Sequence, residues 1–307
     1  IIDEYTGRIA EGRQWQDGIH QAVQARESVE ITPENRQTAS ITIQSYFRLY
    51  PQLAGMTGTA WTSRREFRKV YRKPVIRIPT NRPLQRTALP PVLLPTANAK
   101  WQAVVQETNR MMDDGRAVLI GTRTVESSEQ LSKCLAAANI DHQVLNARQD
   151  EREAEIIAMA GKPRQVTVAT NMAGRGTDIK LDPAVTEAGG LHVILTEIHE
   201  AERIDWQMVG RGCRQGDPGS FRIFVSLQDE ILRLGLGPAR STRIQSRFTA
   251  RDSLPPSLFR LFRLAQARLE RRHLVDRMVL RRADKDRHQQ YFEMGLDPYL
   301  FATTTSR

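Results

Sequence analysis

The sequence has few cysteines and aromatic residues and no long apolar run. Its two cysteines, Cys134 and Cys213, among 307 residues cannot form a disulfide framework, so a reducing compartment is the simplest interpretation. No apolar run comes near the length of about 18 residues that a membrane-spanning helix needs. With 40% hydrophobic and 26% charged residues, the composition argues against a disordered or collagen-like chain. The length predicts two domains, or one large domain with appendages.

Two nucleotide-binding signatures are also absent from the sequence. It contains no Gly-x-x-x-x-Gly-Lys-[Ser/Thr] phosphate loop and no Asp-Glu-Ala-Asp-type magnesium site. The chain starts at Ile1 without a methionine and without the basic-then-apolar layout of a signal peptide. We interpret this start as the edge of a fragment.

The positive charge is concentrated at one end of the chain. Residues 240–307 contain 15 basic and 7 acidic residues and so carry +8 of the net charge of +10. Such a segment can meet nucleic acid, anionic lipid headgroups or an acidic partner, because all three respond to the same field. A solvated, arginine-rich helix face is the simpler alternative, and the charge alone does not choose among these.

Short β-rich runs alternate with helical patterns between residues 117 and 226, which is typical of βαβ units around a parallel sheet. We expect strands at 117–122, 142–145, 165–170, 191–196 and 220–226. We expect helices at 150–160, at 201–209 and from a Ser127/Gln130 capping pair to Ala138, with Cys134 in the core. The pattern predicts an open α/β sheet whose ligand lies at the carboxyl ends of the strands.

The flanking regions have a different character. Helices are expected at 17–26 and 37–49, and the proline-bearing stretch 74–95 is expected to be an extended connection. After a breaker at 235–238, one face of a predicted helix carries an apolar stripe made of Leu258, Phe262, Ala265 and Leu269. This stripe suits either a lipid headgroup interface or packing against the sheet domain.

Two segments of the predicted sheet domain combine glycine with arginine. In the first, a strand runs into a turn whose glycines let backbone amides approach an anion closely. Arg175 adds positive charge there, and Asp178 can accept hydrogen bonds from a ribose hydroxyl or hold a partner arginine. The turn contains Gly174, Arg175, Gly176, Thr177 and Asp178.

The second segment runs from Gln207 to Gly219. Arg211 and Arg214 are three residues apart, so on a helix their guanidinium groups leave from one face. Two adjacent guanidinium groups repel each other unless an anion lies between them, and phosphate is the anion that we expect to bind there. An isolated Arg-x-x-Arg is more often a solvated helix face, so each segment alone is a modest signal.

Together, in this order after a sheet, the two segments resemble the fifth and sixth motifs of the superfamily-two ATPases. The combination of Asn-Met-Ala-Gly-Arg-Gly-Thr-Asp-Ile at 171–179 with Gly-Arg-x-x-Arg-Gln-Gly-Asp-Pro-Gly at 210–219 is similar to the SecA family, the ATPase motors of bacterial preprotein export. Six further stretches are similar to that family in the same order: 3–8, 17–22, 53–60, 78–83, 144–147 and 153–156.

The resemblance implies a division of the chain into three parts. Residues 1–62 would close the first nucleotide-binding domain, and residues 63–235 would be a linker and the second, RecA-like domain with an open parallel sheet. Residues 236–307 would begin a basic helical scaffold. The implied function is an ATP-driven motor for preprotein export, and we expect the chain alone to be inactive as an ATPase.

The resemblance also implies roles for individual residues. Arg211 and Arg214 resemble the catalytic finger arginines, which stabilise charge on phosphoryl oxygens in the transition state. The residues that resemble the nucleotide-binding positions are Asp178, Arg175, Gly174, Gly176 and Gln207. The implied cofactors are ATP and Mg²⁺, with Mg²⁺ held by first-domain motifs that this sequence lacks and no metal ligand on this chain.

The implied partners are the Sec channel, preproteins, an anionic phospholipid surface and, as an option, a second copy of the protein. The implied location is the cytoplasm, at the inner face of the cytoplasmic membrane. A superfamily-two nucleic-acid helicase is one alternative, but only 6% of residues are aromatic and none lies in the basic-aromatic alternation that stacks single strands. A non-enzymatic interaction module is the other.

The sixth motif departs from the family pattern. Val209 stands where the family usually has arginine, and Cys213 stands where it usually has glycine. Cys213 is either inert packing or a disturbance of the geometry that aims Arg214. Ile198 likewise replaces an expected arginine.

Overall fold

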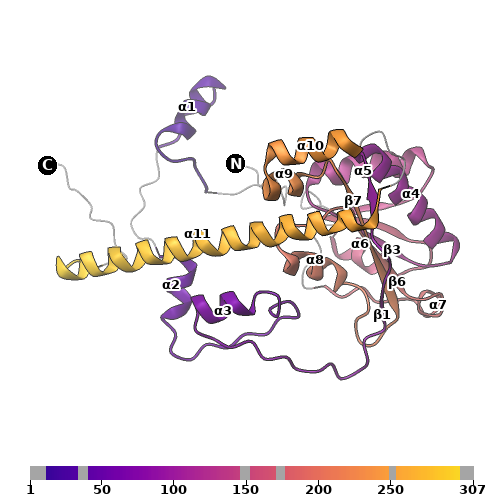
Figure 1. Ribbon diagram of the computed structural model, residues 1–307, viewed down its shortest axis with the longest axis horizontal. Coiled ribbons are helices and arrows are strands. Elements are labelled where there is room, and N and C mark those ends of the chain that lie inside the picture. The colour runs from indigo at the N-terminus through magenta and orange to yellow at the C-terminus, as the bar shows by residue number, and fades with distance from the viewer. Residues whose placement is uncertain (1–11, 34–40, 146–152, 171–176, 249–253, 298–307) are drawn as a thin grey trace.

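The computed structural model describes residues 12–33, 41–145, 153–170, 177–248 and 254–297. Its centre is a sheet with the strand order β1-β7-β6-β3-β5-β4, and β2 also pairs with β7 (Figure 1). Every strand pair is parallel, so the expected open α/β sheet is confirmed. The strands are β1 (Arg86–Ala88), β2 (Val92–Leu94), β3 (Val118–Thr122), β4 (Gln143–Leu145), β5 (Val166–Thr170), β6 (Leu191–Leu195) and β7 (Gly219–Ser226).

The helices pack on both faces of this sheet and extend well beyond it (Figure 1). A short 3-10 turn, η2 (Pro256–Leu258), precedes the longest helix. The α-helices are α1 (Ile19–Arg26), α2 (Ile43–Arg48), α3 (Arg64–Val70), α4 (Ala97–Asp113), α5 (Val125–Ala137), α6 (Glu153–Met159), α7 (Pro183–Glu187), α8 (Glu202–Val209), α9 (Glu230–Leu236), α10 (Pro238–Phe248) and α11 (Phe259–Glu293).

The central strands are apolar on both faces, which explains their continuous runs of Val, Ile and Leu. In β3, Val118 and Ile120 belong to the core shared with α4 and α5. Leu119, between them, belongs to the core shared with α8, α9 and α11. Since successive strand residues point to opposite faces, the sheet separates two cores.

Several elements differ from the sequence expectation. The stretch 74–95 is not only a connection, because β1 and β2 lie within it and pair with β7. The N-cap of helix α5 is Thr124 and not Ser127 as expected. The Thr124 hydroxyl accepts a hydrogen bond from the backbone amide of Ser127. Helix α2 covers only part of the expected 37–49, of which 37–40 lie outside the described residues. Cys134 is half-buried at the edge of a core.

Helix α11 joins two separate parts of the chain. Its 35 residues correspond to a length of about 50 Å, and its first half lies over the sheet domain while its second half passes α2 (Figure 1). In the second half, Arg277 pairs with Glu66 at 2.6 Å and the Thr42 hydroxyl donates to Asp284 at 3.0 Å. No helix in the described ranges is both long and apolar enough to cross a membrane.

The apolar stripe at the start of α11 packs against the sheet domain. Phe262, Ala265 and Leu269 are buried in the core that contains β6 and α9, and Leu258 packs beside them from η2. A Cβ atom on Gly235 would lie 2.6 Å from the backbone of Ala265. The glycine therefore permits α9 and α11 to approach this closely, and the stripe is not available to a lipid surface.

Replacing Gly235 with alanine is expected to destabilise the fold. The added methyl group must displace backbone atoms rather than a flexible side chain, so we expect a loss of about 1–3 kcal/mol in the free energy of unfolding. Denaturant unfolding measures this change. Gly58→Ala is the control, because a Cβ there meets nothing within 4 Å; equal stability of the two variants would contradict the close packing.

A buried polar cluster lies between α4 and the strands β6 and β7. His192 of β6 shares a hydrogen bond of 2.7 Å with the Ser220 hydroxyl. Glu107 of α4 accepts from Arg222 at 3.0 Å and lies 3.5 Å from the imidazole. Burial, followed by the positive charge of Arg116, lowers the pKa of His192 to about 3. The imidazole is therefore neutral in the folded protein.

His192 is expected to make the folded state less stable in acid. The unfolded chain protonates this residue below a pH of about 6.5, whereas the folded chain does so only near its lower pKa, so stability falls as the pH drops from about 6.5 towards 3. The largest slope from one residue is about 1.4 kcal/mol per pH unit. Unfolding free energies at pH 6.5 and 5 should differ less in His192→Gln than in the wild type; identical differences would refute the assignment.

Candidate functional site

Thr177 and Asp178, the described end of the first glycine-arginine segment, meet the second segment at the carboxyl edge of the sheet. Asp178 follows β5, and Arg214 follows α8, which itself follows β6. The Arg214 Nη1 atom donates to an Asp178 carboxylate oxygen at 2.8 Å and to the Thr177 carbonyl at 3.2 Å. The expectation that Asp178 can hold a partner arginine is therefore confirmed.

The Arg214 guanidinium is held by three hydrogen bonds to described residues. Its Nε atom donates to the carbonyl of Gly210 at 3.2 Å, so it folds back over the end of α8. Among the residues that the structure describes, none of the hydrogen bonds that Arg214 donates involves its Nη2 atom. The side chain is 37% exposed and that of Asp178 is 47% exposed. The pair is thus partly exposed, and no described residue accepts a hydrogen bond from Nη2.

Arg211 and Arg214 do not share a helix face, contrary to the sequence expectation. Helix α8 ends at Val209, and Gly210 is its C-terminal cap. The backbone then tightens, with the Arg211 amide donating to the Met208 carbonyl at 3.0 Å. Arg211 is buried and Arg214 is partly exposed. The prediction was wrong because glycines on both sides of Arg211 let the chain leave the helix.

Cys213 lies in a backbone conformation that favours glycine. Its φ angle is +58°, in the left-handed region that L-residues with a Cβ rarely adopt. The side chain is buried, and burial raises the pKa of the thiol although Arg86 opposes this. The glycine usual at this position in the resembling family fits this φ angle, and the buried thiol is consistent with inert packing.

The turn that carries these arginines accepts hydrogen bonds from two residues that precede β1 and from the first residue of β1. Arg82 donates to the Gln215 carbonyl at 3.0 Å, Gln85 to the Gly216 carbonyl at 2.9 Å and Arg86 to the Gly212 carbonyl at 3.2 Å. Arg82 lies in stretch 78–83, which resembles the family in sequence, but that resemblance did not indicate a contact with this turn. The contacts join positions more than 120 residues apart, so no local sequence pattern indicates them.

A second group of supporting residues comes from α11. The Gln266 side-chain amide donates to the Asp205 carboxylate at 2.7 Å. Glu270 accepts from the first backbone amide of α8, that of Glu202, also at 2.7 Å. Gln207, on the same helix, is half-buried. The sequence analysis missed Gln266 and Glu270 because the helical pattern marked only the apolar stripe beside them.

Some predicted positions lie outside the described residues. These are Gly174, Arg175 and Gly176, and their proposed anion contacts stay predictions. Within the described ranges, no group of three or more His, Cys, Asp or Glu side chains is arranged to hold a metal ion.

By fold, the domain is an open parallel α/β sheet of the RecA-like class, with the Arg214–Asp178 pair at its carboxyl edge. The SecA P-loop domain family matches residues 83–185 and 182–252, and the SecA DEAD-like domain family matches residues 3–68. The chain therefore belongs to the SecA family. This membership favours the main hypothesis over a nucleic-acid helicase.

Two curated relatives extend the similarity over nearly the whole chain. Protein translocase subunit SecA 2 of Rhodopirellula baltica is 52% identical over 300 residues, which are 98% of this chain and 46% of the relative. Protein translocase subunit SecA of Heliobacterium modesticaldum is 47% identical over 293 residues, 94% of this chain and 35% of the relative. The chain thus spans less than half the length of these relatives.

Among solved structures, the E. coli DEAD-box protein SrmB bound to the regulator of ribonuclease activity A covers 52% of this chain and 87% of its own. Its identity is 20% and its TM-score 0.40, a likeness too low to carry an argument about function.

Substitutions at Cys213 should separate backbone strain from side-chain packing. A β-branched residue is a strong outlier at positive φ, so we expect Cys213→Val to lose about 2 kcal/mol or more of unfolding free energy. In Cys213→Gly, relief of strain offsets the lost thiol contacts, and we expect a change within about 1 kcal/mol. Thermal or denaturant unfolding measures both, and a Val variant as stable as the Gly variant would contradict the left-handed conformation.

Proposed function

We propose that the chain forms one side of the ATP site of a SecA-type protein translocase. The observation that carries this proposal is the partly exposed Arg214–Asp178 pair, in which Asp178 holds the guanidinium at the sheet edge and no described residue accepts a hydrogen bond from Nη2. A guanidinium fixed in this way suits phosphate oxygens, which accept charge-assisted hydrogen bonds from its planar edge.

The remaining residues of the site support the same role. Gln207 and the buried Arg211 belong to the same helix and turn as Arg214. Asp178 is exposed enough to accept a hydrogen bond from a ribose hydroxyl with the oxygen that Arg214 does not occupy. These donors and acceptors fit a nucleotide that enters from the carboxyl edge of the sheet.

In the proposed mechanism, this chain supplies electrostatic stabilisation rather than a nucleophile. Bound ATP with Mg²⁺ supplies the phosphoanhydride bond whose hydrolysis drives the motor. Arg214 donates to the phosphoryl oxygens as their negative charge redistributes in the transition state, and Asp178 keeps the guanidinium oriented. The triphosphate cradle and the Mg²⁺ ligands would come from the part of the protein outside this sequence.

We further propose that the whole protein moves preproteins through the Sec channel at the inner face of the cytoplasmic membrane. The names of the relatives support the translocase activity. Contact with anionic phospholipid would depend on exposed arginines of α10 and α11, such as Arg243, Arg268 and Arg272, because the apolar stripe of α11 is covered.

In the full-length protein, Arg214→Ala should lower the ATPase kcat by about 10³-fold or more, with ATP affinity within a few-fold. The reason is that a finger arginine acts mainly on the transition state. Asp178→Asn should weaken ATP binding or lower kcat by a smaller factor. Phosphate release and isothermal titration measure the two quantities.

The 307-residue chain alone should hydrolyse ATP no faster than background, and Arg268→Ala, an exposed arginine of α11, is the matched control in the full-length protein. If Arg214→Ala changed only affinity, or if the isolated chain hydrolysed ATP in an Arg214-dependent way, the proposed division of the site would be wrong.

A further inference from the structure

Helix α8, which leads into the arginines, does not cap its own N-terminus. Its N-cap residue is Ala201, which has no side-chain acceptor. The Glu202 amide instead donates to the carboxylate of Glu270 at 2.7 Å, so the cap comes from α11, 68 positions further along the chain. A carboxylate at this end of a helix also interacts favourably with the helix dipole.

The same face of α11 makes a second contact with α8, one turn before Glu270. The side-chain amide of Gln266 donates to Asp205 at 2.7 Å and to the His199 carbonyl at 2.9 Å. The other Asp205 oxygen accepts from the His199 amide at 2.9 Å and lies 2.7 Å from its imidazole. Arg263 completes the set by donating to the side-chain Oε1 atom of Gln266 at 3.0 Å.

The Gln266 contacts are buried, and the Glu270 contact is partly buried. Gln266, Asp205 and His199 are each 5% exposed or less, and burial raises the pKa of Glu270 although the hydrogen bond from Glu202 opposes this. Buried polar groups of this kind are costly unless they are satisfied, so their geometry is tightly specified. The start of α8 therefore has one well-defined position relative to α11.

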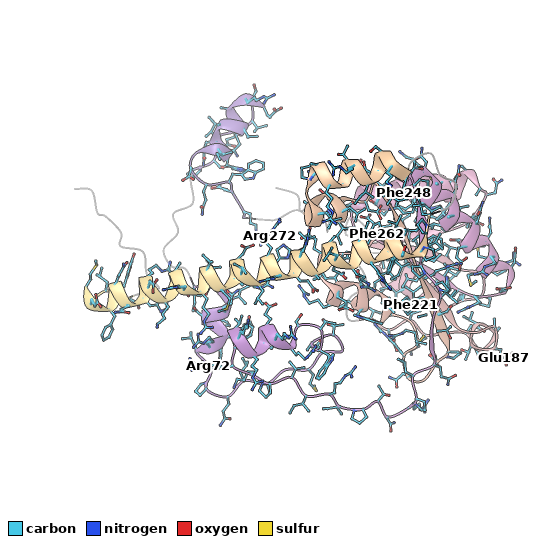
Figure 2. All side chains as sticks on the ribbon, viewed as in Figure 1. Arg72, Glu187, Phe221, Phe248, Phe262 and Arg272 are labelled. Carbon is cyan, nitrogen blue, oxygen red and sulfur yellow. The ribbon has the colours of Figure 1, made fainter. Side chains whose placement is uncertain are left out.

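The opposite side of α8 is equally constrained. Met208 packs on Gly121 of β3, where a Cβ atom would lie 2.7 Å from the Met208 side chain. A helix of eight residues moves as a rigid unit, so a shift at Glu202 displaces the turn at 210–214. Figure 2 labels Phe262 on the part of α11 over the sheet domain and Arg272 farther along the helix, and Gln266 and Glu270 lie between these two positions in the sequence.

We propose that Glu270 and Gln266 are positioning residues for ATP turnover, which hold α8 and so set where Arg211 and Arg214 lie. Neither side chain would touch the nucleotide. This inference rests on the proposed function, because it assigns Glu270 and Gln266 a role in that same site.

The test compares Glu270→Ala, Glu270→Gln and Gln266→Leu in the full-length protein. Glu270→Ala removes the cap, whereas Glu270→Gln keeps an oxygen that can accept from the Glu202 amide. Asp276→Ala is the control, since it removes an exposed acid from the same helix. Steady-state phosphate release gives kcat and KM, and hydrogen exchange of peptides from α8 and β6 reports local opening.

We expect Glu270→Ala and Gln266→Leu to lower kcat about tenfold with KM for ATP within about twofold of the wild type. Glu270→Gln should recover most of kcat. Exchange should rise about tenfold in α8 of the two impaired variants and stay unchanged in β6. The control should match the wild type in every measurement.

A kcat equal to that of the control in Glu270→Ala and Gln266→Leu would overturn the proposal. So would an effect on KM alone, or an impaired Glu270→Gln together with faster exchange in β6, which would indicate a merely structural role. If Arg214→Ala abolishes turnover while these variants do not, only the positioning role fails. If the wild-type protein hydrolyses no ATP, the proposed function fails and the positioning role fails with it.

Discussion

The close packing of α11 on α9 is the contact on which the arrangement of the site depends. Gly235 allows the helix backbones to meet at Ala265, and Phe262 and Leu269 are buried on the same face of α11. Once this face is fixed, the neighbouring face is fixed too, because a helix turns by about 100° per residue. That neighbouring face carries Gln266 towards α8, so an apolar contact sets the position of a polar one.

The Arg214–Asp178 pair illustrates how a partly exposed ion pair serves binding rather than stability. A surface ion pair of this kind contributes little to the free energy of folding. It does, however, reduce the freedom of a long side chain and leave its remaining donors aligned. A guanidinium prepared in this way loses less conformational entropy when an anion arrives, which is an advantage for a site completed by another part of the protein.

The sheet could be predicted from the sequence because buried parallel strands are continuous apolar runs, and the runs at 117–122 and 191–196 stand out clearly. The edge pieces β1 and β2 could not, since three-residue strands beside prolines carry almost no periodicity. The predicted helical face for Arg211 and Arg214 was wrong, because three-residue spacing has meaning only while the helix continues, and it ends at Gly210. The contacts of Gln266 and Glu270 depend on tertiary packing across more than 60 positions, which no local pattern encodes.

The two edges of the sheet have a consequence for self-association. On one side β7 is bordered by β1 and β2, each of three residues, and Pro90 and Pro91 lie between them without an amide hydrogen to donate. On the other side the described part of β4 is also only three residues long. Short and interrupted edges offer a poor template for a strand from a neighbouring molecule. The domain is thereby protected against edge-to-edge aggregation, although its centre consists of some of the most β-prone segments of the chain.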